Sequence, residues 1–330
     1  MEVVLLCVVI VVALGFDFTN GFHDTANAVA TSVSTRALSP RLAVAIAASA
    51  NLAGAFATTA VAKTVGQGII DSGLATTHTI LAALVGAIAW NLLTWWWGLP
   101  SSSSHALFGG LIGAALAQSG TSGVEWHGLA HKVAIPALLA PTIAFAAGFG
   151  LLLVLYWAFG TWVSPGIGNR GFRLGQLASG TFMAFTHGAN DAQKTMGVIA
   201  LALFAHGSID EFHIPLWVKI SAGIAIAAGT YSGGWRIMRT LGQRLYKMEP
   251  AAGFAAQTSA SITIFLATRL GYPLSTTHTI SGAVLGAGAT RRLSAVRWGI
   301  AGNIVTAWIL TIPAAGIVAA AVYWPVVWIF

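Results

Sequence analysis

Residues 18–24 read FTNGFHD, and residues 185–191 repeat this stretch as FTHGAND. Two further pairs follow in the same order: KTVGQ at 63–67 with RTLGQ at 239–243, and GLPSSSSH at 98–105 with GYPLSTTH at 271–278. Three matches in one order and at similar spacing are typical of an internal duplication. We therefore predict two homologous halves, residues 1–160 and 173–330, joined by a linker at 161–172.

The basic residues lie in loops that do not correspond between the halves. The first-half loop with Arg36 and Arg41 matches a second-half loop near 203–214 that contains Asp210 and Glu211 and no basic residue. Because basic loops stay cytoplasmic, this exchange predicts inverted repeats, a cytoplasmic linker and both termini outside. Conversely, the basic residues of two second-half loops match first-half stretches with only Lys63; they are Arg236, Arg239, Arg244, Lys247, Arg291, Arg292 and Arg297.

The composition is that of a membrane protein. Of the 330 residues, 56% are hydrophobic and 8% are charged, against roughly 25% charged in soluble domains, which excludes a soluble enzyme. The net charge of +7 comes from short loops between apolar runs, so it does not indicate a nucleic-acid partner. A single cysteine, Cys7, excludes an internal disulfide and a cysteine metal cluster.

Apolar runs of membrane length predict an all-α polytopic bundle in contact with the lipid bilayer. Two runs, 3–35 and 173–207, contain polar motifs and are expected to be helices broken at the midplane. Counting each broken run once gives about ten crossings, or up to about twelve segments. This architecture favours a transporter over a passive channel or a structural bundle. The continuous runs lie at 42–62, 78–97, 100–117, 133–159, 216–235, 251–269, 273–290 and 299–323.

Asp24 and Asp191 are repeat-related carboxylates inside apolar runs, with Asn27 and Asn190 close by. Charged groups at membrane depth are costly and mark ion pathways, so we predict that these four residues bind the coupling ion or relay its proton. A carboxylate that only caps a restarting helix is the alternative. Asp17 has Ala184 as its counterpart and is predicted to support the site.

The two PxS[ST][ST]H segments predict an anion site, because glycine and proline end one run and three hydroxyl residues open the next. Two facing helix N-termini would supply N–H donors and partial positive charge, whereas simple N-capping is the alternative. Hydroxyls both donate and accept, which favours phosphate, with its own protons, over sulfate. The predicted ligands are Ser102, Ser103, Ser104, Ser275, Thr276 and Thr277.

Four histidines lie beside these motifs. His105 and His278 are one turn inside the hydroxyl segments, and His23 and His187 flank the acidic motifs. We predict that they relay protons or orient the anion, with hydrogen bonding between packed helices as the alternative.

The paired motifs GFHD at 21–24 and GAND at 188–191, together with the hydroxyl segments, resemble those of the inorganic phosphate transporter (PiT) family. The longer strings NGFHDTANAVATS and HGANDAQKTMGVI are similar to its bacterial low-affinity branch, and the resemblance spans nearly the whole chain. It implies symport of phosphate across a prokaryotic inner (plasma) membrane, with the acidic motifs on the coupling ion and the hydroxyls on the phosphate. It also implies that phosphate can travel with a divalent metal.

Two departures from the family pattern concern the coupling ion. Sodium-coupled members resemble G-A-N-D-x-x-N in each half, but here His23 and Lys194 stand where asparagines are expected. A titratable or cationic nitrogen in place of an oxygen ligand favours H+ over Na+. Lys194 also lies three residues after Asp191, so the two can pair on a helix.

Three alternatives remain open: a sulfate permease of the same family, a sodium-coupled phosphate symporter and an intramembrane hydrolase. The hydrolase would use Ser104 or Thr277 as nucleophile, but symmetric hydroxyls single out neither. We therefore expect a non-enzymatic phosphate importer with no cofactor beyond its coupling cation. The sequence leaves metal ligands and homo-oligomer formation open.

Overall fold

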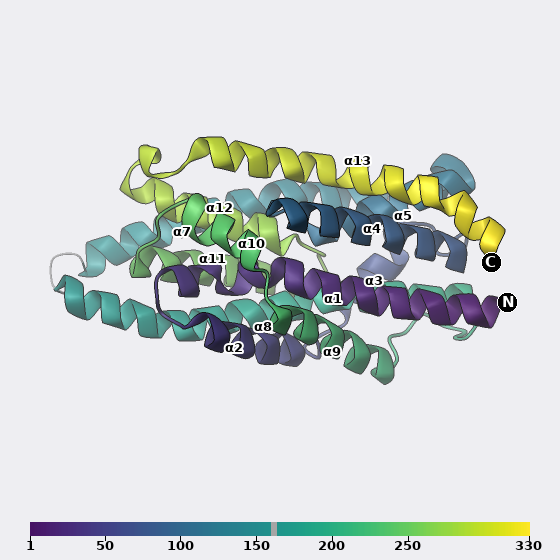
Figure 1. Ribbon diagram of the computed structural model, residues 1–330, viewed down its shortest axis with the longest axis horizontal. Coiled ribbons are helices and arrows are strands. Elements are labelled where there is room, and N and C mark those ends of the chain that lie inside the picture. The colour runs from purple at the N-terminus through teal and green to yellow at the C-terminus, as the bar shows by residue number, and fades with distance from the viewer. Residues whose placement is uncertain (160–163) are drawn as a thin grey trace.

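The computed structural model describes residues 1–159 and 164–330, which are predominantly helical (Figure 1). Helices follow in the same order in the two parts of the chain: α1 corresponds to α8, α2 to α9, α3 to α10, α4 to α11, α5 to α12 and α7 to α13. Their bounds are α1 Glu2–Ser34, α2 Pro40–Gly54, α3 Ala60–Gln67, α4 Thr77–Trp97, α5 Ser103–Ser119, α6 Trp126–Gly128, α7 Ile135–Phe159, α8 Pro165–Ala205, α9 Leu216–Ser232, α10 Trp235–Arg239, α11 Pro250–Arg269, α12 Thr276–Arg291 and α13 Trp298–Ile329.

The long helices α1 and α8 run antiparallel through the middle of the bundle. Thr35 at the end of α1 donates a hydrogen bond to Gln176 near the start of α8, at 2.8 Å. Farther along α1, Ser32 lies against Gly180 of α8. The N- and C-termini lie at the same end of the molecule (Figure 1).

The acidic motifs lie within continuous helices, so the prediction of broken helices at 3–35 and 173–207 is wrong. α1 covers residues 2–34 and α8 covers residues 165–205 without interruption. The motif glycines allow close helix packing instead. A Cβ at Gly21 would lie 2.4 Å from the carbonyl oxygen of Ile226 on α9, and one at Gly188 would lie 2.2 Å from that of Asn51 on α2.

The hydroxyl segments do interrupt the helices, as predicted. Gly98 ends α4 with φ of +67°, and Gly271 follows α11 with φ of +77°. This left-handed backbone suits glycine and turns the chain away from the preceding helix. α5 then begins at Ser103 and α12 at Thr276.

Two predicted continuous runs are also interrupted. The run at 42–62 contains the end of α2 and the start of α3, where the Ala60 amide donates to the Thr58 hydroxyl at 3.2 Å. The run at 216–235 is divided at Gly233, whose φ is +78°. Of the predicted linker, residues 161–163 lie outside the described residues, and the part from Pro165 onward belongs to α8.

α5 and α12, the helices that begin in the hydroxyl segments, each pack against the last helix of the other half. On α5, a Cβ at Gly109 would lie 2.3 Å from the Ile312 carbonyl oxygen of α13, and one at Gly113 would lie 2.1 Å from that of Gly316. The counterparts on α12, Gly282 and Gly286, approach the backbone of α7 equally closely. Paired glycines four residues apart are typical of tight contacts between membrane helices.

Five segments among the described residues are long and apolar enough to cross a membrane. They comprise α1, α4, residues 126–159, α11 and α13. α8 joins these five segments around a buried polar centre.

Candidate functional site

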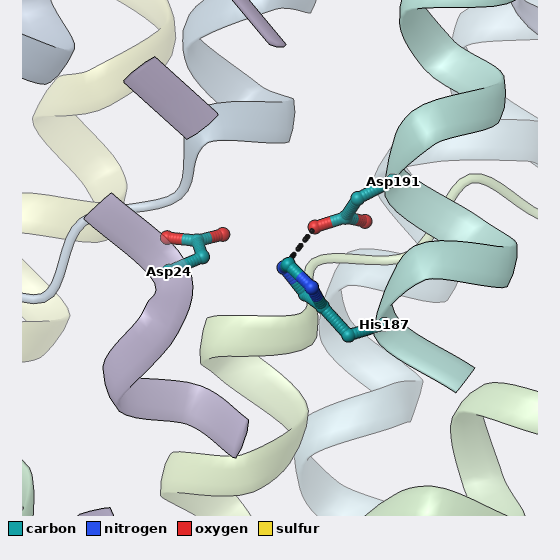
Figure 2. A group of neighbouring side chains, drawn as sticks. All are labelled: Asp24, His187 and Asp191. Carbon is teal, nitrogen blue, oxygen red and sulfur yellow. Dashed lines mark ion pairs between the residues drawn. The ribbon is translucent and has the colours of Figure 1, made fainter. Parts of the chain in front are cut away.

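Asp24 of α1 and Asp191 of α8 meet where these helices pack together (Figure 2). Oxygen atoms of both carboxylates and a ring nitrogen of His187 lie within 4.8 Å of one another. None of the three residues is more than 2% exposed. Two carboxylates and an imidazole in this space are a donor set that can hold a divalent cation.

The hydrogen bonds of His187 indicate which of its ring nitrogens faces the carboxylates. Asn51 donates its amide to the Thr230 hydroxyl at 2.7 Å, so its Oδ1 is the atom that lies 3.0 Å from Nδ1 of His187. Nδ1 therefore carries a proton, because it faces an acceptor. Nε2 lies 3.1 Å from Oδ2 of Asp191 but is not aligned for a hydrogen bond with any described residue. In neutral His187 this nitrogen presents a lone pair to the space between the carboxylates.

Asp24 is surrounded by hydrogen-bonding groups from both halves. Nδ1 of His23 lies 2.7 Å from one carboxylate oxygen, and the Ser103 hydroxyl donates to the other at 2.8 Å. Thr277 donates to the first oxygen at 3.4 Å. Nε2 of His23 lies 3.2 Å from the Thr94 hydroxyl, which fixes the ring between α1 and α4. Asp24 is thus held as an acceptor.

Lys194 of α8 is fully buried and also contacts the cluster. Its ammonium group forms an ion pair with Asp191, one turn earlier on α8. It also donates to the Ser104 hydroxyl at 2.5 Å and to the Leu274 carbonyl at 2.7 Å. These contacts confirm the pairing predicted from the three-residue spacing and extend it to both hydroxyl segments.

The six predicted hydroxyl residues divide into two kinds. Ser102 accepts a hydrogen bond from the His105 amide at 3.1 Å, and Ser275 accepts one from the His278 amide at 3.2 Å, so both are N-caps. The next two residues of each helix reach the carboxylate cluster: Ser103 and Ser104 from α5, and Thr276 and Thr277 from α12. Two helix N-termini therefore converge on one buried place, with the partial positive charge that attracts anions.

Only one of the two predicted asparagines contacts the cluster. Asn27 donates to the Thr277 hydroxyl at 2.9 Å and belongs to the cluster. Asn190 turns toward the α11–α12 connection, where it donates to the Thr268 hydroxyl at 2.8 Å and to the Tyr272 carbonyl at 3.1 Å. Within the described part of the chain, the amide oxygens of both asparagines lack a hydrogen-bond donor.

His105 and His278 contact each other rather than Asp24 or Asp191. Their rings are perpendicular with centroids 4.5 Å apart, and His278 stacks on Trp308 of α13 at 3.9 Å. Asp17 is buried on α1 but is also not hydrogen-bonded to the cluster. Of the four predicted supporting residues, His105, His278 and Asp17 thus lie around the cluster, whereas His187 is part of it.

Sequence reasoning missed several polar residues of the site. Asn20 accepts from Ser103 at 2.6 Å, and its position one turn before Asp24 was a usable signal. Thr94, Asn51 and Thr230 each stand in apolar helices with no repeat-related partner to mark them, so only the packing of those helices brings them to the site.

A duplicated, helical chain with a buried ion pair and two helix N-termini at its centre is built as a membrane transporter. The sequence profile of the phosphate transporter family matches the chain twice, over residues 20–167 and 164–319. The chain belongs to this family.

Relatives over nearly the full length are similar to this chain. A probable low-affinity inorganic phosphate transporter of Rhizobium meliloti is 51% identical over 321 residues, covering 97% of this chain and 96% of the relative. The protein of that description from Bacillus subtilis is 42% identical over 330 residues, covering 98% of each chain. The one from Mycobacterium tuberculosis H37Rv is 50% identical over 333 residues, covering 98% of this chain and 78% of the relative.

A solved structure described as the sodium-dependent phosphate transporter has the same fold. Its TM-score is 0.92, and the match covers 99% of this chain and 100% of that one. At 24% sequence identity, this similarity establishes the fold alone. The chain is thus a phosphate transporter and not an enzyme.

Proposed function

We propose that the protein imports inorganic phosphate by symport with protons, and that phosphate binds between the starts of α5 and α12. One observation carries the location of the anion: hydroxyls from both helix starts converge on the same buried cluster. The four ligands are Ser103, Ser104, Thr276 and Thr277. Their hydroxyls exchange donor and acceptor roles, as binding of a protonated phosphate requires.

The charges around this site require a cation to enter with the anion. Lys194 offsets the charge of one of the two carboxylates, Asp24 and Asp191. A bound phosphate adds further negative charge in a place where water does not screen it. A co-transported cation restores the balance and gives a physical reason for symport.

The proposed cation is the proton because nitrogen atoms fill positions that oxygen ligands of sodium would occupy. Lys194 binds Asp191 with a fixed positive charge, and His23 contacts Asp24. A sodium-coupled mechanism is the second candidate, since the solved structure of the same fold is described as sodium-dependent. Lys194 stands against it, because its ammonium group competes with sodium for Asp191.

Phosphate accompanied by a divalent metal also fits the proposed site. The metal would bind Asp24, Nε2 of His187 and the Asp191 oxygen that faces His187 rather than Lys194, while the phosphate faces the hydroxyls. Asn51 supports this role, because metal-binding histidines commonly donate their other ring N–H to an oxygen.

We further propose that the two halves are inverted repeats in an inner (plasma) membrane, with about ten crossings. Both termini would then be extracytoplasmic. The swapped charges of the loops and the matching helix order support this topology. The site residues are at most 2% exposed, so the structure is closed around the site and transport requires helices to move.

Uptake into proteoliposomes tests this proposal. Labelled phosphate should accumulate when an inward proton gradient is imposed without sodium, and excess unlabelled sulfate should compete poorly. Accumulation that needs a sodium gradient and ignores pH would establish the sodium-coupled alternative. Strong competition by sulfate would assign a different principal substrate.

A further inference from the structure

Asp17 is the one buried acidic residue of α1 and α8 that the proposed phosphate site does not use. It is 0% exposed, and neither of its carboxylate oxygens has a hydrogen-bond partner in residues 1–159 or 164–330. A charged carboxylate without partners is unfavourable in such a place, so a group left in this condition commonly takes up a proton or binds a cation. Asp17 can therefore bind a proton or a cation, because no described residue occupies its carboxylate oxygens.

The packing of α1 on α8 shows what lies beside Asp17. Thr35 contacts Gln176, Ser32 contacts Gly180 and Asp24 lies beside His187, which fixes an antiparallel register.

Continued toward the N-terminus of α1, this register places Asp17 opposite Lys194 and Thr195. The neighbours of its carboxyl group agree: Thr195 and Asn20 are close enough to act on it as hydrogen-bonding groups, although neither has the geometry of a formed hydrogen bond, and Lys194 and Asp191 act through their charges.

Thr195 is, like Asp17, a buried polar residue without a hydrogen-bond partner among the described residues. It is 0% exposed, and its hydroxyl also lacks a hydrogen-bond partner in the described structure. A protonated Asp17 can donate to this hydroxyl, and an ionised Asp17 can accept from it. Two facing unpartnered groups on different helices thus form a small site on the N-terminal side of Asp24 along α1.

Unlike Asp17, the two aspartates of the phosphate site accept hydrogen bonds from neighbouring side chains. Asp24 accepts from Ser103 and Thr277, and Asp191 accepts from Lys194 and Thr276. Each of these hydrogen bonds points a donor at a carboxylate oxygen, so little acceptor capacity is left for a further proton. A transported proton needs a carboxyl group without such donors.

Resting on the proton symport proposed above, we infer that Asp17 is the residue that carries the coupling proton, with Thr195 as its hydrogen-bond partner. The proton binds an oxygen of the Asp17 carboxylate and leaves from it, and no other bond changes. Asp17 is linked to the phosphate site through Asn20, which accepts from Ser103 at 2.6 Å, and through Lys194, which binds Ser104. Loading of the proton thus changes the charge next to the phosphate ligands.

Two charged residues of α8, Asp191 and Lys194, are electrostatic neighbours of Asp17. Helices α2, α4, α5, α9, α10, α11 and α12 and the turn at 240–244 also pack on α1. The titratable residues on these elements are Arg41, His78, His105, Lys219, Tyr231, Arg236, Arg239, Arg244, Arg269, His278 and Arg291.

Asp17→Asn tests the inference, because asparagine has nearly the shape of the protonated carboxyl group but cannot release a proton. Each reconstituted variant is measured in two assays: exchange of labelled for unlabelled phosphate, which needs no net proton movement, and accumulation driven by a pH gradient. We expect the variant to retain exchange and to lose accumulation, down to the level found without a gradient. Asp210→Asn, which removes an exposed acid of the loop before α9, is the matched control and should retain both.

Thr195→Val gives a second measurement on a milder change. It keeps the proton-binding carboxylate and removes its partner, so accumulation should persist with a displaced pH profile. Gradient-driven accumulation by Asp17→Asn would overturn the inference, as would loss of exchange by a well-folded Asp17→Asn protein, which would make Asp17 a phosphate-site residue. Wild-type protein that accumulates phosphate only with sodium would instead overturn the proposed proton symport.

Discussion

The ammonium group of Lys194 bridges Asp191, one turn earlier on its own helix, and the hydroxyl of Ser104 at the start of α5. The lysine therefore connects the acidic motif of the second half with the hydroxyl segment of the first. A fixed cation in this position offsets carboxylate charge and still leaves the helix N-termini free to attract phosphate.

Lys194→Met should destabilise the protein strongly, because it leaves the Asp191 carboxylate buried without its cation. Breaking a buried pair from one side costs about 3 to 5 kcal/mol. The double variant Asp191→Asn with Lys194→Met removes both charges and should be more stable than Lys194→Met alone. Thermal unfolding in detergent measures this, and equal stability of the single and double variants would show that the pair is not energetically coupled.

Ser103→Ala and Thr276→Ala should each weaken phosphate binding by about 1 to 3 kcal/mol, since each removes a hydrogen bond to a charged ligand. The cap variant Ser102→Ala is the control: it should lower stability by about 1 kcal/mol through loss of the N-cap. Calorimetric titration of purified protein with phosphate separates these effects. Unchanged affinity in both Ser103→Ala and Thr276→Ala would mean that their hydroxyls serve only the helix starts.

The duplicated strings predicted much of this arrangement from the sequence. Asp24 and Asp191, and the two hydroxyl segments, could be paired because each motif has a counterpart in the other half. The start of α5 at Ser103 followed from glycine, proline and capping residues, all of which act locally. Local signals and repetition therefore picked out the residues that the fold brings together in this cluster.

What the sequence could not show depends on contacts between distant helices. Gly21 and Gly188 belong to the motifs at which the sequence predicts broken helices, but they lie where another backbone comes within contact distance of a continuous helix. Glycine serves either purpose, and only the neighbouring helix decides which. The same holds for Asn51, whose role in orienting His187 appears only when α2 is packed on α8.

Gly113→Ala should destabilise the bundle by more than about 2 kcal/mol, because its new Cβ would lie 2.1 Å from the Gly316 carbonyl oxygen. The contact is between the backbones of α5 and α13, so no flexible side chain can move aside. Gly302→Ala on α13 is the matched control, since nothing described lies within 4 Å of its Cβ position. It should be neutral or slightly stabilising in unfolding experiments. Equal stability of the two variants would contradict the close α5–α13 contact.

The inverted topology predicts which loops can be labelled from each side of the membrane. In a Cys7→Ser background, single variants Ser122→Cys, Asp210→Cys and Lys247→Cys place a thiol at three exposed positions. The loops with Ser122 and Asp210 lack the basic clusters of their counterparts in the other half, whereas the loop with Lys247 contains several arginines. Because basic loops remain cytoplasmic, a membrane-impermeant maleimide applied to intact cells should label the first two variants and not the third.

Permeabilised cells provide the control, in which all three should react. Labelling of Ser122→Cys and Lys247→Cys from the same side would show that the two halves have parallel orientations, and the proposed exchange of basic loops between the halves would then be wrong.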